Sequence, residues 1–153
     1  MFEKVLVCLD GSSLAEQIVP YLLAEGRCFG KLILIKVVDT SGINLPLGVP
    51  GGPGVPMHTR AMEKRFQEEM ADMPGYLEKI AQPLKDEGID TECVVLQGIP
   101  SETIKAYVEE NDISLIAIAT HGHSGLRRVV MGSTAEYILT HCGTPVLLVT
   151  PKR

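Results

Sequence analysis

The residues most capable of chemistry lie in a glycine-rich stretch from Thr120 to Thr134. It contains three glycines, Gly122, Gly125 and Gly132. Glycines let a backbone pass close to an anion and turn its N–H groups toward it, and a helix that begins after Gly132 would add free donors and a partial positive charge. This pattern is typical of a phosphate cradle. The same residues also suit plain turns and a helix capped by Ser133 and Glu136, and local chemistry leaves both interpretations open.

Five short apolar runs of β type would form the scaffold for this stretch. They are Lys4–Leu9, Lys31–Val38, Glu92–Leu96, Leu115–Ala119 and Pro145–Val149. Most of them are continuously apolar instead of alternating, which is typical of strands buried on both faces of a parallel sheet. Helices are therefore expected on both faces.

Segments with helical periodicity separate these runs. The expected apolar stripes are Leu14, Ile18, Tyr21 and Leu22 behind a Ser13–Glu16 capping box, Ile104 and Val108 after Pro100, and Ala135, Ile138, Leu139 and Cys142 behind a Ser133–Glu136 box. A longer stripe runs from Met62 to Leu84, and its methionines are expected to pack against the sheet. Pro74-Gly75 within it predicts a kink or the start of a second helix.

The alternation of strands and helices predicts an α/β fold: a doubly wound five-stranded parallel sheet in the order 3-2-1-4-5, with right-handed crossovers. Such sheets bind ligands beyond the carboxyl ends of their strands, at the topological switch point. Polar turns stand at these places in the sequence, Asp10-Gly11-Ser12 after the first run and Thr120-His121-Gly122 after the fourth. Asp10 is equally suited to capping a helix or closing a turn.

Composition limits the classes of function. The 153 residues, 45% of them hydrophobic, predict one domain over 1–153, and a net charge of −5 argues against nucleic acid as a partner. No apolar run is long enough for a membrane span or a signal peptide. Four cysteines without a Cys-x-x-Cys pair are expected to be reduced thiols in a cytoplasmic protein. The stretch from Gly42 to Pro56, rich in glycine and proline, is expected to be a long flexible loop within the domain.

Several spaced motifs in order resemble the universal stress protein family over essentially the whole chain. They are strand-Asp10-Gly11-Ser12, Gly98-Ile99-Pro100-x-Glu102, Thr120-His121-Gly122-x9-Gly132-Ser133-x-x-Glu136, and Thr144-Pro145 before the last apolar run. The ATP-binding branch of that family carries Gly-x2-Gly-x9-Gly-Ser/Thr after its fourth strand. Ala119 stands where this pattern has its first glycine, so the sequence departs from it by one methyl group.

The resemblance implies a binding site for ATP, or for ADP or AMP, with Mg²⁺ held mainly by phosphates and water. Asp10 would lie at the adenine and ribose end, and the backbone of Val37 would contact the adenine edge. The full set of implied nucleotide-binding residues is Asp10, Ser12, Val37, Ala119, His121, Gly122, Gly132, Ser133 and Thr134. No residues are assigned to a metal, because His121-Gly122-His123 offers no third ligand.

The resemblance further implies a nucleotide-dependent stress or signalling switch that hydrolyses ATP slowly or not at all, since no general base or arginine finger is evident. The loop 42–56 would be the moving element, and the last strand, Val146–Val149, would pair across a homodimer. The protein partner that reads the switch is not identified by the sequence.

Two alternatives remain. Some members of the family bind no nucleotide and act through protein interactions, and Ala119 favours that interpretation. Thr120-His121-Gly122-His123 also satisfies the Thr/His-x-Gly-His signature of nucleotidyltransferases. In that superfamily, however, the signature follows the first strand, whereas here it follows the fourth apolar run.

Overall fold

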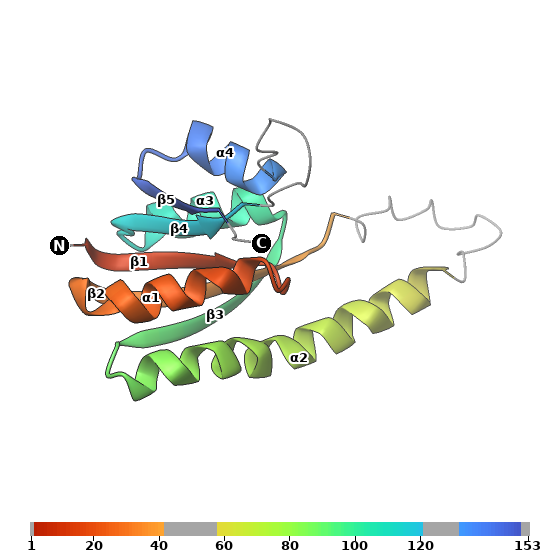
Figure 1. Cartoon of the computed structure of the whole chain (residues 1–153). Coiled ribbons are helices and arrows are strands. Elements are labelled where there is room, and N and C mark those ends of the chain that lie inside the picture. The colour runs from red at the N-terminus through yellow and green to blue at the C-terminus, as the bar shows by residue number, and fades with distance from the viewer. Residues whose placement is uncertain (1, 42–57, 121–131, 151–153) are drawn as a thin grey trace, which may run out of the picture.

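A five-stranded parallel sheet in the order β3-β2-β1-β4-β5 forms the centre of the molecule in a computed structural model, which describes residues 2–41, 58–120 and 132–150 (Figure 1). The strands are β1 (Phe2–Leu9), β2 (Phe29–Asp39), β3 (Thr91–Gly98), β4 (Leu115–Ala119) and β5 (Val146–Val149). All four neighbouring pairs are parallel. The predicted fold class and strand order are confirmed. The expected loop 42–56 lies outside the described residues.

β1, β2 and β3 are longer than the apolar runs that predicted them. Pairing extends from Phe2 opposite Phe29 to Asp39 opposite Gly98. Hydrophobicity marks only the buried middle of a strand, whereas its ends are set by backbone pairing. Gly30 allows one such close approach, because a Cβ at this position would collide with the main-chain carbonyl of Glu3.

Apolar side chains cover both faces of the sheet. On one face Val5, Val7, Leu32 and Leu34 pack with residues of α1 and α2, and on the other Leu6, Ile33, Ile35 and Ile116 pack with residues of α3 and α4. The continuously apolar runs are thus explained, because successive residues of a strand point to opposite faces and both faces are buried.

Two helices begin differently from the predicted capping boxes. The chain enters the short 3-10 helix η1 (Ala15–Ile18) and α1 (Val19–Glu25) through Ser12 instead of Ser13, since the N–H of Ala15 donates to Ser12 Oγ at 3.2 Å. In α4 (Ser133–His141) the N-cap is Gly132, no side chain caps the helix, and Ser133 is already its first residue. The prediction of both capping boxes is therefore wrong.

Two members of the predicted stripes are exposed. Tyr21 and Leu139 are 42% and 40% exposed, whereas Ile18, Leu22 and Ile138 are buried. In α3 (Pro100–Glu110), Ile104 and Val108 are buried as expected. The stripes therefore locate the contact face of each helix but overestimate its width.

The helix α2 (His58–Asp86) runs unbroken past Pro74 and Pro83, so a second helix does not begin at Pro74-Gly75. Its C-terminal part packs on the sheet through Leu77, Ile80 and Leu84. Its N-terminal part, yellow in Figure 1, extends beyond the sheet. Met70 and Met73 lie on that extension and are only half-buried, outside both core clusters. The prediction that they pack against the sheet is wrong.

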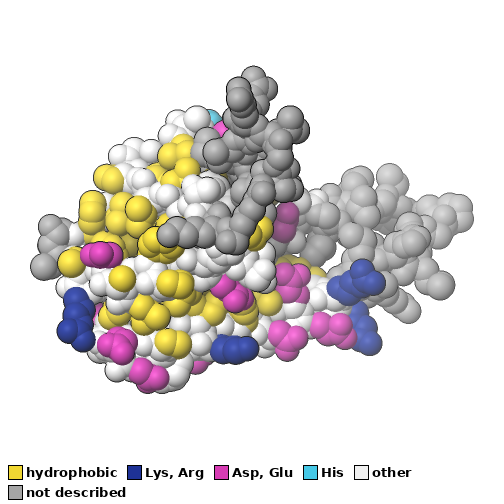
Figure 2. Space-filling view, viewed as in Figure 1, with side chains coloured by type: hydrophobic (Ala, Val, Ile, Leu, Met, Phe, Trp, Pro, Cys, Tyr) yellow, Lys and Arg dark blue, Asp and Glu magenta, His cyan; other side chains and the backbone are white. Residues whose placement is uncertain are grey.

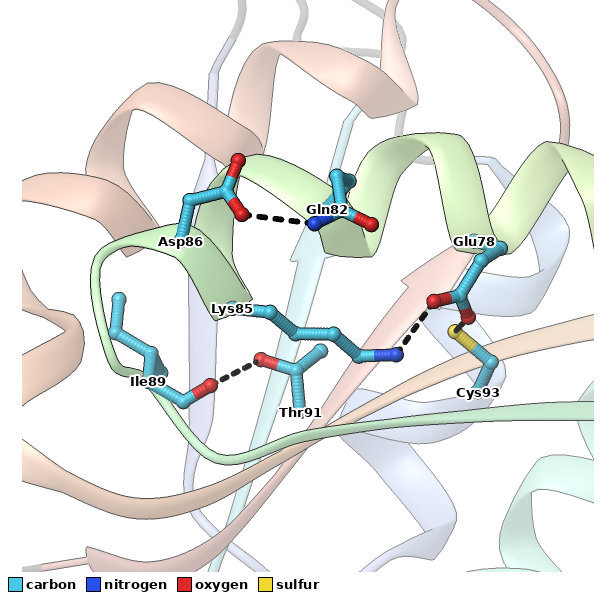
Figure 3. Close-up of polar contacts among 7 residues, drawn as sticks. All are labelled: Glu78, Gln82, Lys85, Asp86, Ile89, Thr91 and Cys93. Carbon is cyan, nitrogen blue, oxygen red and sulfur yellow. Dashed lines mark hydrogen bonds and ion pairs between the residues drawn. The ribbon is translucent and has the colours of Figure 1, made fainter.

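A polar contact links the C-terminal part of α2 to β3, beside an ion pair within the helix (Figure 3). Lys85 Nζ lies 2.6 Å from Glu78 Oε1, and the Cys93 thiol donates to Glu78 Oε2 at 3.7 Å. The hydrogen bond from Lys85 lowers the pKa of Glu78, whereas burial, followed by the charge of Glu78, raises the pKa of Cys93. Cys93 therefore stays a protonated thiol that packs in the structure.

Replacing Gly75 by alanine should stabilise the protein. Gly75 lies inside α2, and an added Cβ would meet no heavy atom within 4 Å. Because glycine is about 1 kcal/mol less favourable than alanine in a helix interior, the free energy of unfolding should rise by about that amount in urea titrations. Gly30→Ala is the contrasting variant and should destabilise the fold. A loss of stability in Gly75→Ala would show that the helix does not continue through this position in solution.

Candidate functional site

A cavity of about 350 Å³ opens at the carboxyl ends of β1, β2 and β4, a volume within the range of small-ligand sites. Its lining residues come from every element that ends or begins there. They are Cys8, Leu9, Asp10, Ala15, Lys36, Val37, Asp39, Glu69, Pro100, Ile104, Ile118, Ala119, Gly132, Ser133, Thr134 and Ala135. This is the switch point at which the sequence predicted a site, since β1 lies between β2 and β4 and the chain reverses direction across the sheet there.

The unequal lengths of β1 and β2 help to open the cavity. β1 ends at Leu9, opposite Lys36, whereas β2 continues to Asp39. From Val37 onward β2 is therefore paired in register with β3 only. Val37 and Asp39 of this part of β2 line the cavity.

One side of the cavity is the beginning of α4. Gly132, Ser133 and Thr134 line it, and the first hydrogen bond within the helix is donated by the N–H of Glu136 to the carbonyl of Gly132 at 3.0 Å. The N–H groups of residues 133–135 precede this bond, so they have no acceptor within the helix. Together with the helix dipole, these donors make the side suited to an anion.

The other side is the turn after β1. Asp10 Oδ1 accepts hydrogen bonds from the N–H of Ser12 at 2.8 Å and from Ser12 Oγ at 2.6 Å. Gly11 has φ +87°, a conformation that glycine adopts without steric cost. Asp10 thus closes a turn, as one interpretation predicted, and it also lines the cavity; its place at the adenine and ribose end stays a prediction.

The sequence analysis missed Lys36 and Glu69. Lys36 is 8% exposed, its ammonium donates to the main-chain carbonyl of Asp10 at 2.6 Å, and Glu69 Oε1 of α2 lies 3.8 Å from it. A lysine within an apolar run was the visible sign, because lysine is rarely buried unless it is paired. The position of Glu69 had no such sign, since α2 carries many charges.

Asp39 also lines the cavity. Its Oδ1 accepts a hydrogen bond from the N–H of Ser41 at 2.8 Å, and hydrogen bonding by Ser41 lowers the pKa of this carboxyl. Asp39 therefore carries a negative charge at neutral pH, beside the charge pair of Lys36 and Glu69.

Six of the nine predicted site residues line one cavity: Asp10, Val37, Ala119, Gly132, Ser133 and Thr134. Ser12 lies next to it and is occupied in the turn with Asp10. His121 and Gly122 lie outside the described residues, as does His123. Ala119 ends β4, and Asp112 is the single non-glycine residue with positive φ in the described ranges, so the alanine causes no backbone strain.

Thr120 is 1% exposed and is not among the residues that line the cavity. Its signature follows β4, whereas Asp10-Gly11-Ser12 follows β1. This placement argues against the nucleotidyltransferase alternative, in which the signature follows the first strand.

Within the described ranges, no group of three or more His, Cys, Asp or Glu side chains could hold a metal ion. None of the described helices is long and apolar enough to cross a membrane.

A doubly wound parallel sheet with a cavity at its switch point defines a class of α/β domains that bind small ligands at the ends of their strands. Within that class, the chain belongs to the universal stress protein family, whose family model matches residues 1–150. The universal stress protein MJ0577 of Methanocaldococcus jannaschii is 28% identical over 160 residues, covering 99% of this chain and 97% of the relative.

Solved structures of the family share the fold. The structure of MJ0577 matches with a TM-score of 0.76 at 24% sequence identity. The match covers 100% of this chain and 99% of MJ0577. A family protein of Arabidopsis thaliana with AMP bound has a TM-score of 0.67 at 16% identity, with 98% and 92% of the two chains covered. A universal stress protein in complex with cAMP has a TM-score of 0.60 at 17% sequence identity, with 97% of each chain covered.

Replacing Gly11 by alanine should weaken the fold at the site. Alanine at φ +87° brings its Cβ against the backbone, so the free energy of unfolding should fall by about 1–2 kcal/mol. Gly11→Asn should lower the free energy of unfolding by less, because asparagine tolerates this conformation. Gly143→Ala, at a position with nothing within 4 Å, serves as the control and should change little. Equal urea midpoints for Gly11→Ala and the wild type would contradict the turn geometry.

Proposed function

We propose that the cavity binds an adenine nucleotide and that nucleotide occupancy changes how the protein acts in stress or signalling. One observation carries the proposal: a single cavity joins the Asp10 turn and Val37 to the N-terminus of α4. The first two would hold the nucleoside, and Gly132, Ser133 and Thr134 would hold phosphate through N–H groups. The family proteins with AMP and with cAMP bound support an adenine nucleotide as the ligand.

The proposed ligand is ATP with Mg²⁺, with ADP and AMP as related ligands. Phosphates and water would supply most of the ligands of the ion, which is the usual way in which Mg²⁺ accompanies a nucleotide. Ser133 and Thr134 would add hydroxyl groups near the phosphates. When bound, the ion would neutralise part of the phosphate charge near the acidic side chains of the cavity.

We propose that hydrolysis is slow or absent. A general base must lie within hydrogen-bond reach of the attacking water and be free to accept its proton. Of the three carboxylates among the described residues that line the cavity, those of Asp10 and Asp39 accept backbone hydrogen bonds from Ser12 and Ser41 and close turns, and that of Glu69 lies 3.8 Å from the ammonium of Lys36. A protein that holds ATP without consuming it suits a switch better than a catalyst.

The first experiment is to purify the protein without added nucleotide, denature it, and identify released small molecules by ion-exchange chromatography and mass spectrometry. We expect stoichiometric ATP, ADP or AMP. Gly132→Val should empty the site, because a branched side chain at the N-cap would fill the cradle and crowd the phosphates. Gly143→Val is the matched control, since an added Cβ there meets nothing within 4 Å.

An empty wild-type protein that also shows no heat of binding with Mg-ATP or AMP would contradict the proposal. The protein would then belong with the members of the family that act through protein contacts alone. Release of pyrophosphate from ATP would instead favour the nucleotidyltransferase alternative.

We also propose a homodimer through β5. This strand is at the edge of the sheet, and its Leu147 and Leu148 are 38% and 36% exposed. They border an apolar depression of about 270 Å³ whose wall also includes Tyr21 and Phe29. Figure 2 shows hydrophobic side chains gathered on this face of the molecule. An apolar edge strand is a template for pairing with a second chain, and a two-fold axis would cover both copies.

The dimer is tested by sedimentation equilibrium at micromolar concentration. The wild type should sediment at twice the mass of one chain, and Leu148→Glu should be monomeric because the pairing would bury its charge. Leu139→Glu, on α4 at a similar exposure of 40%, is the matched control and should stay dimeric. A monomeric wild type would overturn this proposal and leave nucleotide binding untouched.

The cytoplasm is the proposed compartment. All four cysteines, Cys8, Cys28, Cys93 and Cys142, are free thiols. Burial raises the pKa of Cys8 to about 12, so this thiol is an inert part of the core. Free thiols of this kind suit a reducing compartment.

A further inference from the structure

Lys36 is the most unusual charged residue of the core. It interrupts the apolar run of β2 and is 8% exposed. Burying an ammonium costs free energy unless it is paired and hydrogen-bonded. Among the described residues that line the cavity, Lys36 carries the only positive charge, beside the carboxylates of Asp10, Asp39 and Glu69.

The ammonium of Lys36 joins three elements at one point. It donates to the main-chain carbonyl of Asp10, after β1, at 2.6 Å, and it lies 3.8 Å from Glu69 Oε1 on α2. It also lies close to Gly11, where a Cβ would be 3.8 Å from Nζ. The short bond to Asp10 is charge-assisted, whereas Glu69 is half exposed and its pairing is long. The bond to Asp10 is therefore the stronger of the two contacts.

This bond sets the position of the Asp10 turn relative to Val37. The hydrogen bonds from Ser12 to Asp10 close the turn internally, and the chain joins it to β1 at Leu9; the Lys36 ammonium adds a side-chain contact to β2. Lys36 precedes Val37 in β2, so its side chain ties the turn to the strand that carries the proposed adenine contact. The Lys36 ammonium thus fixes the Asp10 carbonyl relative to the strand that carries Val37.

We infer that Lys36 is a positioning residue that fixes the Asp10–Gly11 turn for the nucleoside half of the ligand, an inference that rests on the proposed function. Lys36 acts through the turn and not through the phosphates, which belong to the side formed by α4. Its substitution should therefore weaken adenosine and AMP binding by the same factor.

A purely structural role would give a different result. Methionine has a similar length to lysine and would fill the same apolar surroundings. Replacing a buried ion by an apolar side chain of similar volume is often neutral or stabilising, as long as no partner is left buried and unpaired. Asp10 and Glu69 are both exposed enough to be hydrated after the change. Lys36→Met should thus keep its stability and lose its affinity.

The experiment compares the full-length wild type, Lys36→Met and Lys31→Met. Lys31 is the matched control, because it lies on the same strand and pairs with Glu92 at 2.6 Å, and it is not among the residues that line the cavity. Calorimetry would measure the affinity for adenosine and for AMP, urea titration the stability, and hydrogen exchange the protection of the Ser12 amide, which donates to Asp10.

For Lys36→Met we expect roughly a tenfold loss of affinity for adenosine and for AMP, the equivalent of one hydrogen bond, with an unchanged or higher urea midpoint. The Ser12 amide should exchange faster than in the wild type. Lys31→Met should match the wild type in all three measurements. Ser133→Ala, added for comparison, should lower the affinity for AMP and leave the affinity for adenosine unchanged.

Three outcomes would overturn the inference: adenosine affinity within twofold of the wild type, loss of AMP binding alone, or a lowered urea midpoint that accompanies the loss of affinity. Failure of the proposed function looks different, because the wild type itself would then bind neither adenosine nor AMP. In that case the Ser12 amide still reports on the turn, and unchanged exchange in Lys36→Met would show that Lys36 does not hold it.

Discussion

The burial of both faces of the parallel sheet is the constraint on which the rest of the structure depends. Strands that are apolar on both sides must be covered twice, so α1 and α2 cover one face while α3 and α4 cover the other. β1 then lies in the middle of the sheet, between β2 and β4. Because the chain leaves these strands in different directions, the ends of the strands are left uncovered at their junction. The cavity is a result of how the sheet is covered.

The chemistry of the cavity comes mainly from the backbone. The beginning of α4 offers N–H groups on one side, and the extension of β2 past Leu9 offers strand backbone on the other. Side chains act chiefly by holding these segments: Asp10 closes its own turn, Ser12 links it to Ala15, and Lys36 attaches it to β2. Such a site depends on the accuracy of the backbone more than on any one reactive group, which fits a protein that holds a ligand without transforming it.

Much of this arrangement could be predicted from the sequence, because the periodicity of apolar residues is a direct result of burial. It placed the five strands, and with the family motifs it placed Asp10, Val37, Ala119 and Gly132 around one cavity. The first residue of each helix was harder to predict from the sequence. Serine fits several positions of a helix N-terminus. Whether Ser12 or Ser13 contacts the first helix, and whether Gly132 or Ser133 is the N-cap of α4, depends on the direction in which the chain leaves the preceding segment.

Other features depend on contacts that a sequence does not contain. The burial of Lys36 requires a carbonyl from a segment 26 residues away. The continuity of α2 through Pro74 depends on Leu77, Ile80 and Leu84, which are fixed on the sheet in the turns that follow. The start of a second helix at Pro74-Gly75, one of the two outcomes predicted there, is therefore wrong.

The long α2 also has a mechanical consequence. It packs on the sheet through Leu77 and later residues, and Glu69 contacts Lys36, so the part beyond that contact reaches from Glu69 to His58, a distance of about 16 Å at the rise of an α-helix. A rigid rod held at one end acts as a lever, because a tilt at the held end displaces the far end in proportion to the length of the rod. Glu69 lies along this lever next to the ammonium of Lys36. A change in that contact would therefore act on the part of α2 that extends beyond the sheet (Figure 1).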